Sequence, residues 1–233
     1  MIEVNKSREK KKSSLIFGTI NHHTDLVLVS IMASPSSLFS VAGKNVLITG
    51  GSRGIGIMIA KGLQNAGANV LLTSRSEEAC REAAASIPGS QFVVSNVSSR
   101  EGCEELAKHT AKIFDNRLDI LVNNAGTSWG EPLERKSGKA NWGFDKVLDL
   151  NVKGIFYLTR ACIPILSNAA TQENPSRIIN IGSVVGLVSQ EAPTHAYDAS
   201  KAAVHTLTKK FAADLAPKHI TGQLYNVSHS ILC

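Results

Sequence analysis

The sequence predicts an α/β fold built on a doubly wound parallel sheet, and three observations support this prediction. From Val41 onward, short apolar runs alternate with longer segments of amphipathic character. The apolar runs are continuous, as is typical of strands that helices cover on both faces. Apolar residues make up 43% of the chain but aromatic residues only 5%, so the expected core is aliphatic. In such sheets, ligands bind beyond the carboxyl ends of the strands.

Five strands and five helices are expected in alternation, which predicts a Rossmann-like arrangement with right-handed crossovers. The first expected helix ends at Gly67, and the second opens on Ser76, with Glu77 and Glu78 in its first turn. The expected strands are 44–50, 68–75, 90–97, 118–126 and 176–186, and the expected helices are 54–67, 76–87, 99–115, 142–168 and 194–216.

Composition argues against several classes of function. The net charge is +6, but the one dense basic run is Lys6–Lys12, and no basic face with interleaved aromatic residues is present, so nucleic-acid binding is not expected. No apolar run reaches the roughly 18 residues of a membrane span. The four cysteines are far apart in the sequence, which predicts neither disulfides nor a structural metal site and favours the cytoplasm.

Residues 1–40 differ in composition from the rest of the chain and are predicted to be a disordered extension. The basic run leaves a mitochondrial presequence open as an alternative, although Glu3, Glu9 and Asp25 count against it.

A glycine-rich segment, Thr49–Gly56, follows the first expected strand and opens the first expected helix. Gly50 and Gly54 allow a tight turn beside a pyrophosphate, and Gly56 lets the helix pack closely on the strand. The free N–H groups at the start of that helix would face the anion. Tight structural turns also favour glycine, but the position between a strand and a helix favours nucleotide binding.

Cofactor selectivity is predicted from the end of the second strand. NAD sites usually carry a carboxylate there for the ribose 2′-hydroxyl, and this sequence has Ser74-Arg75-Ser76 instead. Arg75 can pair with a 2′-phosphate, and Arg53 in the glycine-rich segment adds a second cation. NADP(H) is therefore the expected cofactor, although two ordinary surface arginines remain the alternative.

Four polar residues form a second group. Tyr197 and Lys201 are four residues apart on one expected helix and share a face. Ser183 ends the fifth strand, and Asn151 lies inside the helix before it. Together with Thr49–Gly56 and the run Asn-Asn-Ala-Gly at 123–126, these residues resemble the short-chain dehydrogenase/reductase family over roughly residues 41–220. Within it, the sequence is most similar to 3-oxoacyl-carrier-protein reductases, including those of the rhamnolipid pathway.

The resemblance implies a role for each residue. Tyr197 would protonate the carbonyl oxygen, with Lys201 favouring the phenolate and binding the nicotinamide ribose. Ser183 would polarise the substrate carbonyl, and Asn151 would hold a water in a proton relay by opening a turn of its helix. Asn96 stands where the family usually has an aspartate facing adenine, and its amide oxygen is expected to accept the same bond. The implied cofactor-binding residues are Gly50, Ser52, Arg53, Gly54, Ile55, Gly56, Arg75, Asn96, Val97, Asn123, Ala125, Gly126, Tyr197 and Lys201, and no metal is implied.

The end of the sequence departs from the family pattern. No Pro-Gly turn follows "APKHIT", so the sixth and seventh strands are expected to be missing, with 41–220 an incomplete reductase domain and 221–233 an atypical tail. The fifth strand would then be an open apolar edge, to which Leu224–Val227 could pair only weakly. Weak NADP(H) binding and slow turnover would follow. The expected homodimer face on helices 142–168 and 194–216 is retained.

The leading functional prediction is an NADP(H)-dependent reductase of a small carbonyl or 3-oxoacyl thioester. The main alternative is a cofactor-binding or dimer-forming protein with little catalytic activity, which the unusual end of the sequence favours. A third reading is a frameshifted or alternatively spliced product with no selected function. The intact set of four catalytic residues favours the enzyme.

Overall fold

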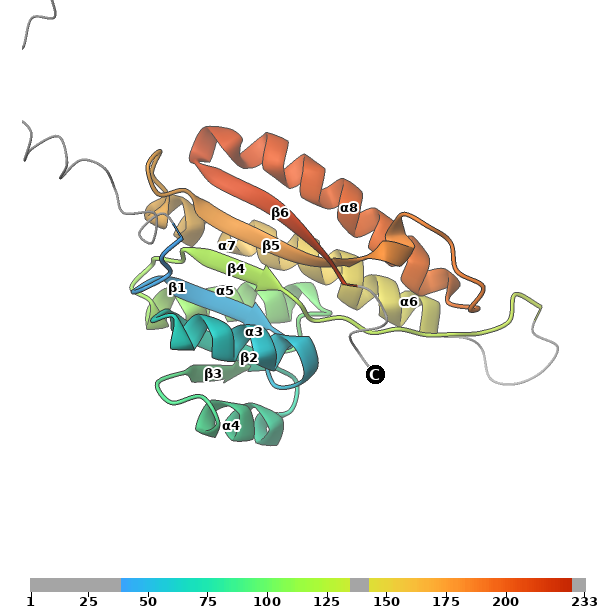
Figure 1. Ribbon diagram of the computed structural model, residues 1–233, viewed down its shortest axis with the longest axis horizontal. Helices are drawn as coiled ribbons and strands as arrows, with labels where there is room; N and C mark the ends of the chain where they lie inside the picture. The colour runs from blue at the N-terminus through green and yellow to red at the C-terminus, as the bar shows by residue number, and fades with distance from the viewer. Residues whose placement is uncertain (1–38, 135–142, 228–233) are drawn as a thin grey trace, which may run out of the picture. The chain divides into compact units, whose positions relative to one another are not determined.

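The computed structural model describes residues 39–134 and 143–227, and it places one six-stranded parallel sheet at the centre of the fold (Figure 1). The strands run in the order β3-β2-β1-β4-β5-β6, so the strand order reverses between β1 and β4. Their bounds are β1 Asn45–Thr49, β2 Asn69–Ser74, β3 Gln91–Val94, β4 Ile120–Asn123, β5 Ser176–Ser183 and β6 Ile220–Val227. The doubly wound parallel fold expected from the sequence is confirmed.

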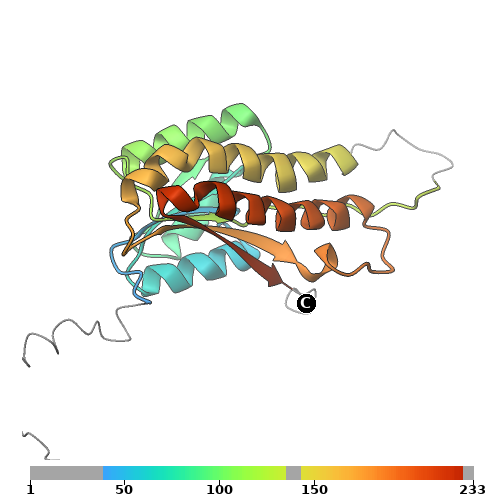
Figure 2. The same cartoon turned by 90° about the horizontal axis from the view of Figure 1, so that it is seen from above.

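Helices lie on both faces of the sheet, with α3 on one side and the row α5, α7 and α8 on the other (Figure 2). The α-helices are α3 Gly54–Asn65, α4 Glu77–Ala85, α5 Arg100–Ile113, α6 Gly143–Leu148, α7 Ile155–Ala169 and α8 His195–Leu215. A π-helix, η1 Asp149–Gly154, joins α6 to α7, and two 3₁₀ turns, η2 Val184–Gly186 and η3 Ala216–Lys218, flank α8.

The continuous apolar strands supply both cores because alternate residues of each strand face opposite layers. Leu47 and Leu71 belong to the core against α5, α7 and α8, whereas their neighbours Val46 and Leu72 belong to the core against α3 and α4. All four side chains are fully buried. The helices therefore hold the strands of the sheet from both sides, and the carboxyl ends of the strands are left for the loops.

The sixth strand corrects one expectation. Strands six and seven were expected to be missing, yet β6 pairs with β5 along eight consecutive residues, from Ser176–Ile220 to Ser183–Val227. Ile220 is 1% exposed and anchors the strand in the core beneath α8. The pattern was missed because β6 contains polar residues and glycine instead of a continuous apolar run. The prediction of an open edge on β5 is therefore wrong. The pairing with β5 is also longer than the expected weak pairing by Leu224–Val227, because it includes all residues of 220–227.

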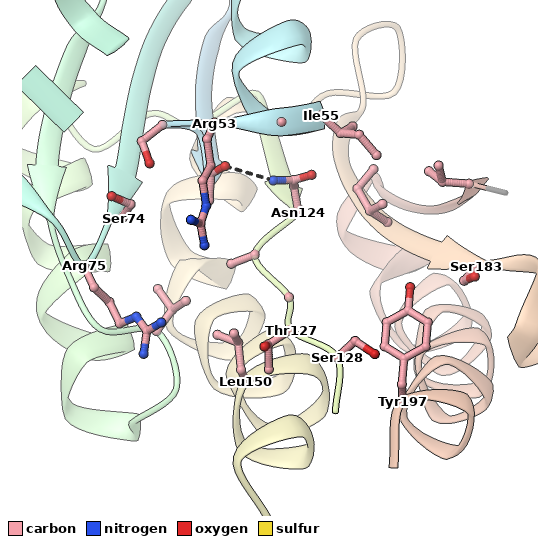
Figure 3. A pocket seen from close by; sticks show the side chains of 18 of the residues that line it. Arg53, Ile55, Ser74, Arg75, Asn124, Thr127, Ser128, Leu150, Ser183 and Tyr197 are labelled. Atoms are coloured by element: carbon pink, nitrogen blue, oxygen red, sulfur yellow. Dashed lines mark hydrogen bonds between the residues drawn. The ribbon is translucent and has the colours of Figure 1, made fainter. Parts of the chain in front are cut away.

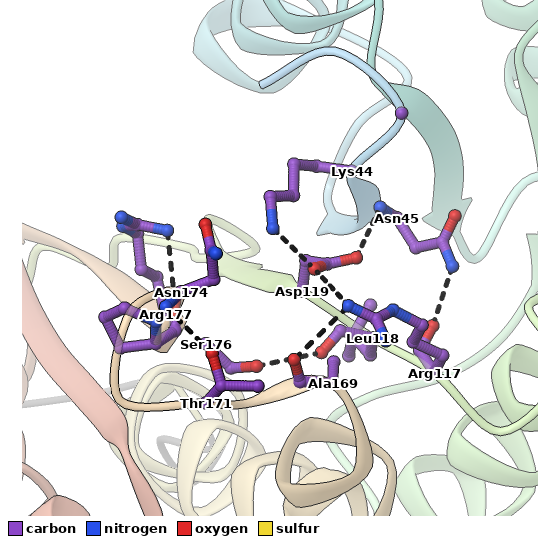
Figure 4. A network of polar contacts seen from close by, with 12 residues as sticks. Lys44, Asn45, Arg117, Leu118, Asp119, Ala169, Thr171, Asn174, Ser176 and Arg177 are labelled. Carbon is purple, nitrogen blue, oxygen red and sulfur yellow. Dashed lines mark hydrogen bonds and ion pairs between the residues drawn. The ribbon is translucent and has the colours of Figure 1, made fainter. Parts of the chain in front are cut away.

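A polar network ties the amino ends of the strands together (Figure 4). The buried carboxylate of Asp119 accepts hydrogen bonds from Lys44 Nζ and from the backbone N–H of Asn45, both at 3.0 Å. Arg117 Nη2 lies 3.6 Å from the same carboxylate. A buried charge is tolerated when it is paired and hydrogen-bonded in this way. The network stabilises the amino ends of the strands, opposite the loops that carry the candidate site residues.

Most of the predicted extension at 1–40 lies outside the described residues, as do 135–142 and the last part of the tail, 228–233. In the described parts of the chain, no helix is long and apolar enough to cross a membrane.

Candidate active site

A pocket of about 570 Å³ opens at the carboxyl ends of the strands, where the strand order reverses between β1 and β4. Ligands bind at this position in open α/β sheets. Figure 3 shows Arg53, Ser74 and Arg75 at one end of the pocket, and Ser183 and Tyr197 at the other. Of the residues expected to form the site, the pocket is lined by Gly50, Ser52, Arg53, Gly54, Ile55, Arg75, Asn96, Val97, Ala125, Gly126, Ser183, Tyr197 and Lys201.

The glycine-rich loop has the conformation expected for contact with a phosphate. Gly50 and Gly54 adopt φ values of +64° and +54°, which favour glycine because it lacks a Cβ atom. Gly56 does not line the pocket, but a Cβ atom there would collide with the carbonyl oxygen of Gly50. The third glycine therefore allows the first turn of α3 to pack directly against the loop.

The start of α3 is suited to an anion. No side chain caps the helix, because its N-cap residue is Arg53 and this side chain makes no capping hydrogen bond. The first turn contains no acidic residue. The free N–H groups and the positive end of the helix dipole therefore remain available to a phosphate group.

Arg53 and Arg75 are exposed at the same end of the pocket, and no carboxylate in the described part of the chain forms an ion pair with either. Arg81, six residues after Arg75 in the sequence, is paired with Glu77. Two unpaired guanidinium groups next to an uncapped helix fit a ligand with several phosphates. These residues therefore fit NADP(H), including its 2′-phosphate.

Gly56 and Gly62 provide a matched pair of substitutions on α3. Gly56→Ala is expected to destabilise the protein by about 1–3 kcal/mol, because the new methyl group overlaps the backbone of the glycine-rich loop. A Cβ atom on Gly62 would meet nothing within 4 Å, so Gly62→Ala is expected to stabilise the helix by about 0.5–1 kcal/mol. Urea unfolding of both variants measures the two changes, and changes of the same sign would contradict this account of the loop.

Two neighbouring asparagines at the end of β4 have different environments, although the sequence does not distinguish them. Asn123 is buried away from the pocket, and its Nδ2 donates to Asn180 Oδ1 at 2.8 Å. Asn124 lines the pocket, and its Nδ2 donates to the carbonyl oxygens of Thr49 at 2.9 Å and Gly50 at 3.1 Å. The run 123–126, which includes Asn124, was expected to line the cofactor side of the site, and Asn124 also holds the glycine-rich loop in place.

Asn96 and Val97 line the pocket after β3, as expected. The side-chain oxygen of Asn96, however, accepts two hydrogen bonds from Ser98, at 3.2 Å from its N–H and 2.7 Å from its hydroxyl. In this arrangement the oxygen is already satisfied. The expected hydrogen bond from an adenine amine to this oxygen therefore has no support in the structure.

Asn151 lies in the π-helix η1, so its helix has the opened turn that the resemblance implied. Its side chain is 1% exposed and does not line the pocket. Oδ1 accepts from Thr127 N at 2.9 Å, and Nδ2 donates to Thr127 O and Ser200 Oγ, both at 2.9 Å. These contacts connect η1 to the loop after β4 and to α8. Both protons of Nδ2 are used in these bonds, so the Asn151 amide group cannot donate to a water.

Lys201 is 7% exposed beneath Tyr197, and its Nζ lies 5.5 Å from the centre of the Tyr197 ring. Nζ donates to the carbonyl oxygen of Ile181 at 2.7 Å. Burial lowers the pKa of Lys201 from 10.5 to about 8, so the amine stays mainly protonated near neutral pH. Two of the three ammonium protons have no described acceptor and can reach a ligand.

Ser183 is 5% exposed and ends β5 on the same side of the pocket as Tyr197 (Figure 3). Its Oγ accepts a long hydrogen bond, at 3.4 Å, from the N–H of Val185. The hydroxyl proton therefore remains available to a ligand oxygen. A hydroxyl donor, a phenol and a buried ammonium thus meet at one end of the pocket.

Comparison with known proteins identifies the family. The sequence profile of the short chain dehydrogenases matches residues 44–226. The chain belongs to the short-chain dehydrogenase family. This short-chain dehydrogenase is 44% identical, over 185 residues, to a protein of Pseudomonas aeruginosa named rhamnolipids biosynthesis 3-oxoacyl-[acyl-carrier-protein] reductase. That match covers 78% of this chain and 71% of the relative. The family and the oxidoreductase class predicted from the sequence are therefore confirmed.

Two further matches place this dehydrogenase among its relatives. A bovine (Bos taurus) L-fucose dehydrogenase is 35% identical over 173 residues, which cover 74% of this chain and 61% of the relative. A solved structure described as the Pseudomonas aeruginosa RhlG/NADP active-site complex is 43% identical, with a TM-score of 0.76. The likeness covers 81% of this chain and 73% of that one.

Proposed function

We propose that the chain is an NADP(H)-dependent reductase that converts a carbonyl group into a secondary alcohol, with a 3-oxoacyl thioester as the favoured substrate class. One observation carries the proposal. At one end a single pocket has Arg53 and Arg75, which form no ion pair within the described residues, beside an uncapped helix. At the other end it has Ser183, Tyr197 and Lys201. The names of the first relative and of the solved complex support the substrate class and the cofactor, respectively.

The bound nicotinamide would supply a hydride to the carbonyl carbon, and the residues of this chain would manage the charge and the proton. Ser183 donates a hydrogen bond to the carbonyl oxygen as negative charge develops there. The Tyr197 hydroxyl gives its proton to that oxygen. The Lys201 ammonium stabilises the resulting phenolate and also binds the ribose next to the nicotinamide. The ammonium can do both because it uses only one proton for Ile181.

The proton lost by Tyr197 must be replaced before the next turnover. Asn151 contributes through its main chain, because a π-helical turn adds a residue without adding a regular helical hydrogen bond. A water held at this carbonyl would carry protons toward Lys201. The side chain of Asn151 keeps the turn in place through Thr127 and Ser200.

The proposal is tested with purified protein, NADPH and the N-acetylcysteamine thioester of 3-oxobutanoate, by following NADPH absorbance. Oxidation of NADPH that requires the thioester supports it. Tight NADPH binding without turnover would instead support the alternative of a cofactor-binding protein with little activity. L-Fucose is the control substrate for the oxidative direction, because one relative carries that name.

A homodimer through helices 142–168 and 194–216 is part of the proposal. Phe144 and Phe156, both in the segment 142–168, are 40% and 39% exposed, and Phe156 stacks on Phe211 of α8 with ring centres 6.3 Å apart. Exposed aromatic residues that span two helices are typical of interfaces. Sedimentation equilibrium tests this. We also propose that the protein acts in the cytoplasm, which agrees with its buried free thiols at Cys80, Cys103 and Cys162.

A further inference from the structure

A cluster of three side chains fixes the loop between η2 and α8. Gln190 Nε2 donates to Thr194 Oγ1 at 2.7 Å and to Asp198 Oδ1 at 3.1 Å, and Thr194 Oγ1 donates to Asp198 Oδ1 at 2.9 Å. Gln190 and Thr194 line the pocket, and Asp198 directly follows Tyr197 on α8. The amide of Gln190 is therefore one hydrogen bond away from the residue next to the proposed proton donor.

The chemistry of this cluster determines which way the amide faces. A carboxylate only accepts hydrogen bonds, so Asp198 must face the NH₂ group of Gln190 and not its oxygen. Both protons of that NH₂ group are used, one by Thr194 and one by Asp198. The opposite orientation would place two acceptor oxygens against each other. Asp198 thus orients the side chain of Gln190.

This orientation leaves Gln190 Oε1 as an acceptor. No donor in the described part of the chain, 39–134 and 143–227, forms a hydrogen bond with it. Polar groups that are held in one orientation in a pocket wall fix the orientation of a ligand and distinguish among ligands. An acceptor selects for a ligand that brings an N–H or O–H group, because an analogue without the donor leaves the oxygen unpaired.

We propose that Gln190 determines specificity by accepting a hydrogen bond from an amide N–H in the thiol half of the substrate. The inference rests on the proposed function and extends it. A 3-oxoacyl group attached to a thiol that carries an amide would place the reacting carbonyl at Ser183 and Tyr197 and the amide beyond it, toward the loop. Thr194 and Asp198 are positioning residues, since they act through Gln190.

A matched pair of substrates isolates this bond. The 3-oxobutanoyl thioester of N-acetylcysteamine carries the amide N–H, and the thioester of 2-acetoxyethanethiol has an ester oxygen in its place. The unmodified protein is expected to prefer the amide by about 5- to 10-fold in kcat/KM, as for one hydrogen bond between neutral groups. Gln190→Met is expected to reduce this ratio to about one, because methionine keeps the length of the side chain but not the acceptor.

Two further variants complete the test. Asp198→Asn is expected to give an intermediate ratio, because an amide at 198 can donate or accept and no longer fixes Gln190. Ser189→Ala, at an exposed neighbouring position outside the cluster, is expected to keep the full ratio. Equal thermal midpoints and NADPH affinities show that the variants are folded. If Gln190→Met does not fold, the ratio measured with Asp198→Asn decides.

The outcomes separate the two claims. If the unmodified protein reduces both thioesters equally well, or if Gln190→Met keeps the preference for the amide, the role of Gln190 is overturned while the proposed function stands. If neither thioester is reduced, the proposed function fails, and the inference fails with it.

Discussion

Replacing Tyr197 by phenylalanine is expected to lower kcat for carbonyl reduction by about 10²- to 10⁴-fold, the usual contribution of a general acid. The substitution removes one hydroxyl group and keeps the ring that packs over Lys201. Binding of NADPH should therefore change little. Steady-state kinetics with the 3-oxobutanoyl thioester, together with a fluorescence titration of NADPH, measures both quantities.

Tyr157→Phe is the matched control, because it removes the same hydroxyl from α7, away from the residues that line the pocket. It is expected to retain kcat within about twofold, as for a substitution outside the site. Comparable losses in the two variants, or full activity of Tyr197→Phe, would show that the Tyr197 hydroxyl is not the proton donor.

Replacing Arg75 by aspartate is expected to reverse the preference for the cofactor. The guanidinium group that faces the pocket would be exchanged for a carboxylate, which repels a 2′-phosphate and can accept a hydrogen bond from a 2′-hydroxyl. The Kd for NADPH is expected to rise by about 10- to 100-fold, which corresponds to the loss of one charge-assisted interaction. The Kd for NADH should stay the same or fall. Fluorescence titration of both cofactors measures the change.

Arg81→Asp makes the same change of charge on α4, outside the pocket, at a residue that is paired with Glu77 on the surface. Its effect on either cofactor is expected to be less than about threefold, because exposed charges are strongly screened. An equal loss of NADPH binding in both variants would mean that only overall charge matters. A Kd for NADPH unchanged by Arg75→Asp would rule out Arg75 as the phosphate contact.

The four central strands, β2, β1, β4 and β5, could be predicted because each is largely buried on both faces and therefore reads as a continuous apolar run. The edge strand β3 could be predicted because Phe92, Val93 and Val94 form a short apolar run. This reasoning failed for β6, which has a neighbour on one side only and carries Gly222, Gln223 and Asn226. Its anchor, Ile220, is a single buried residue that follows a turn at His219 with a positive φ of 55°. Such a strand is recognised by its pairing with β5, which the linear sequence does not display.

The residues of the candidate site also fall into two groups, those that the sequence predicts and those that it does not. The glycines and Arg53 could be predicted from the sequence because a phosphate loop follows a strand and opens a helix. Arg75 could be predicted because it directly follows the second strand, where the cofactor ribose is bound. The different roles of Asn123 and Asn124 could not be predicted, because they depend on which way each side chain turns where β4 ends. The Gln190 cluster was also missed, since its three residues lie in a loop and in the first turn of α8, where spacing alone carries little information.

The central claim is that one pocket brings NADP(H) and a carbonyl substrate together for hydride transfer. The most direct test uses NADPH with deuterium at both C4 positions and detects deuterium in the 3-hydroxyacyl product by mass spectrometry. We expect one deuterium atom per product molecule at the carbinol carbon. Product formation should be greatly slowed in Tyr197→Phe. If NADPH binds but no deuterium reaches the product, the protein is not the reductase described here.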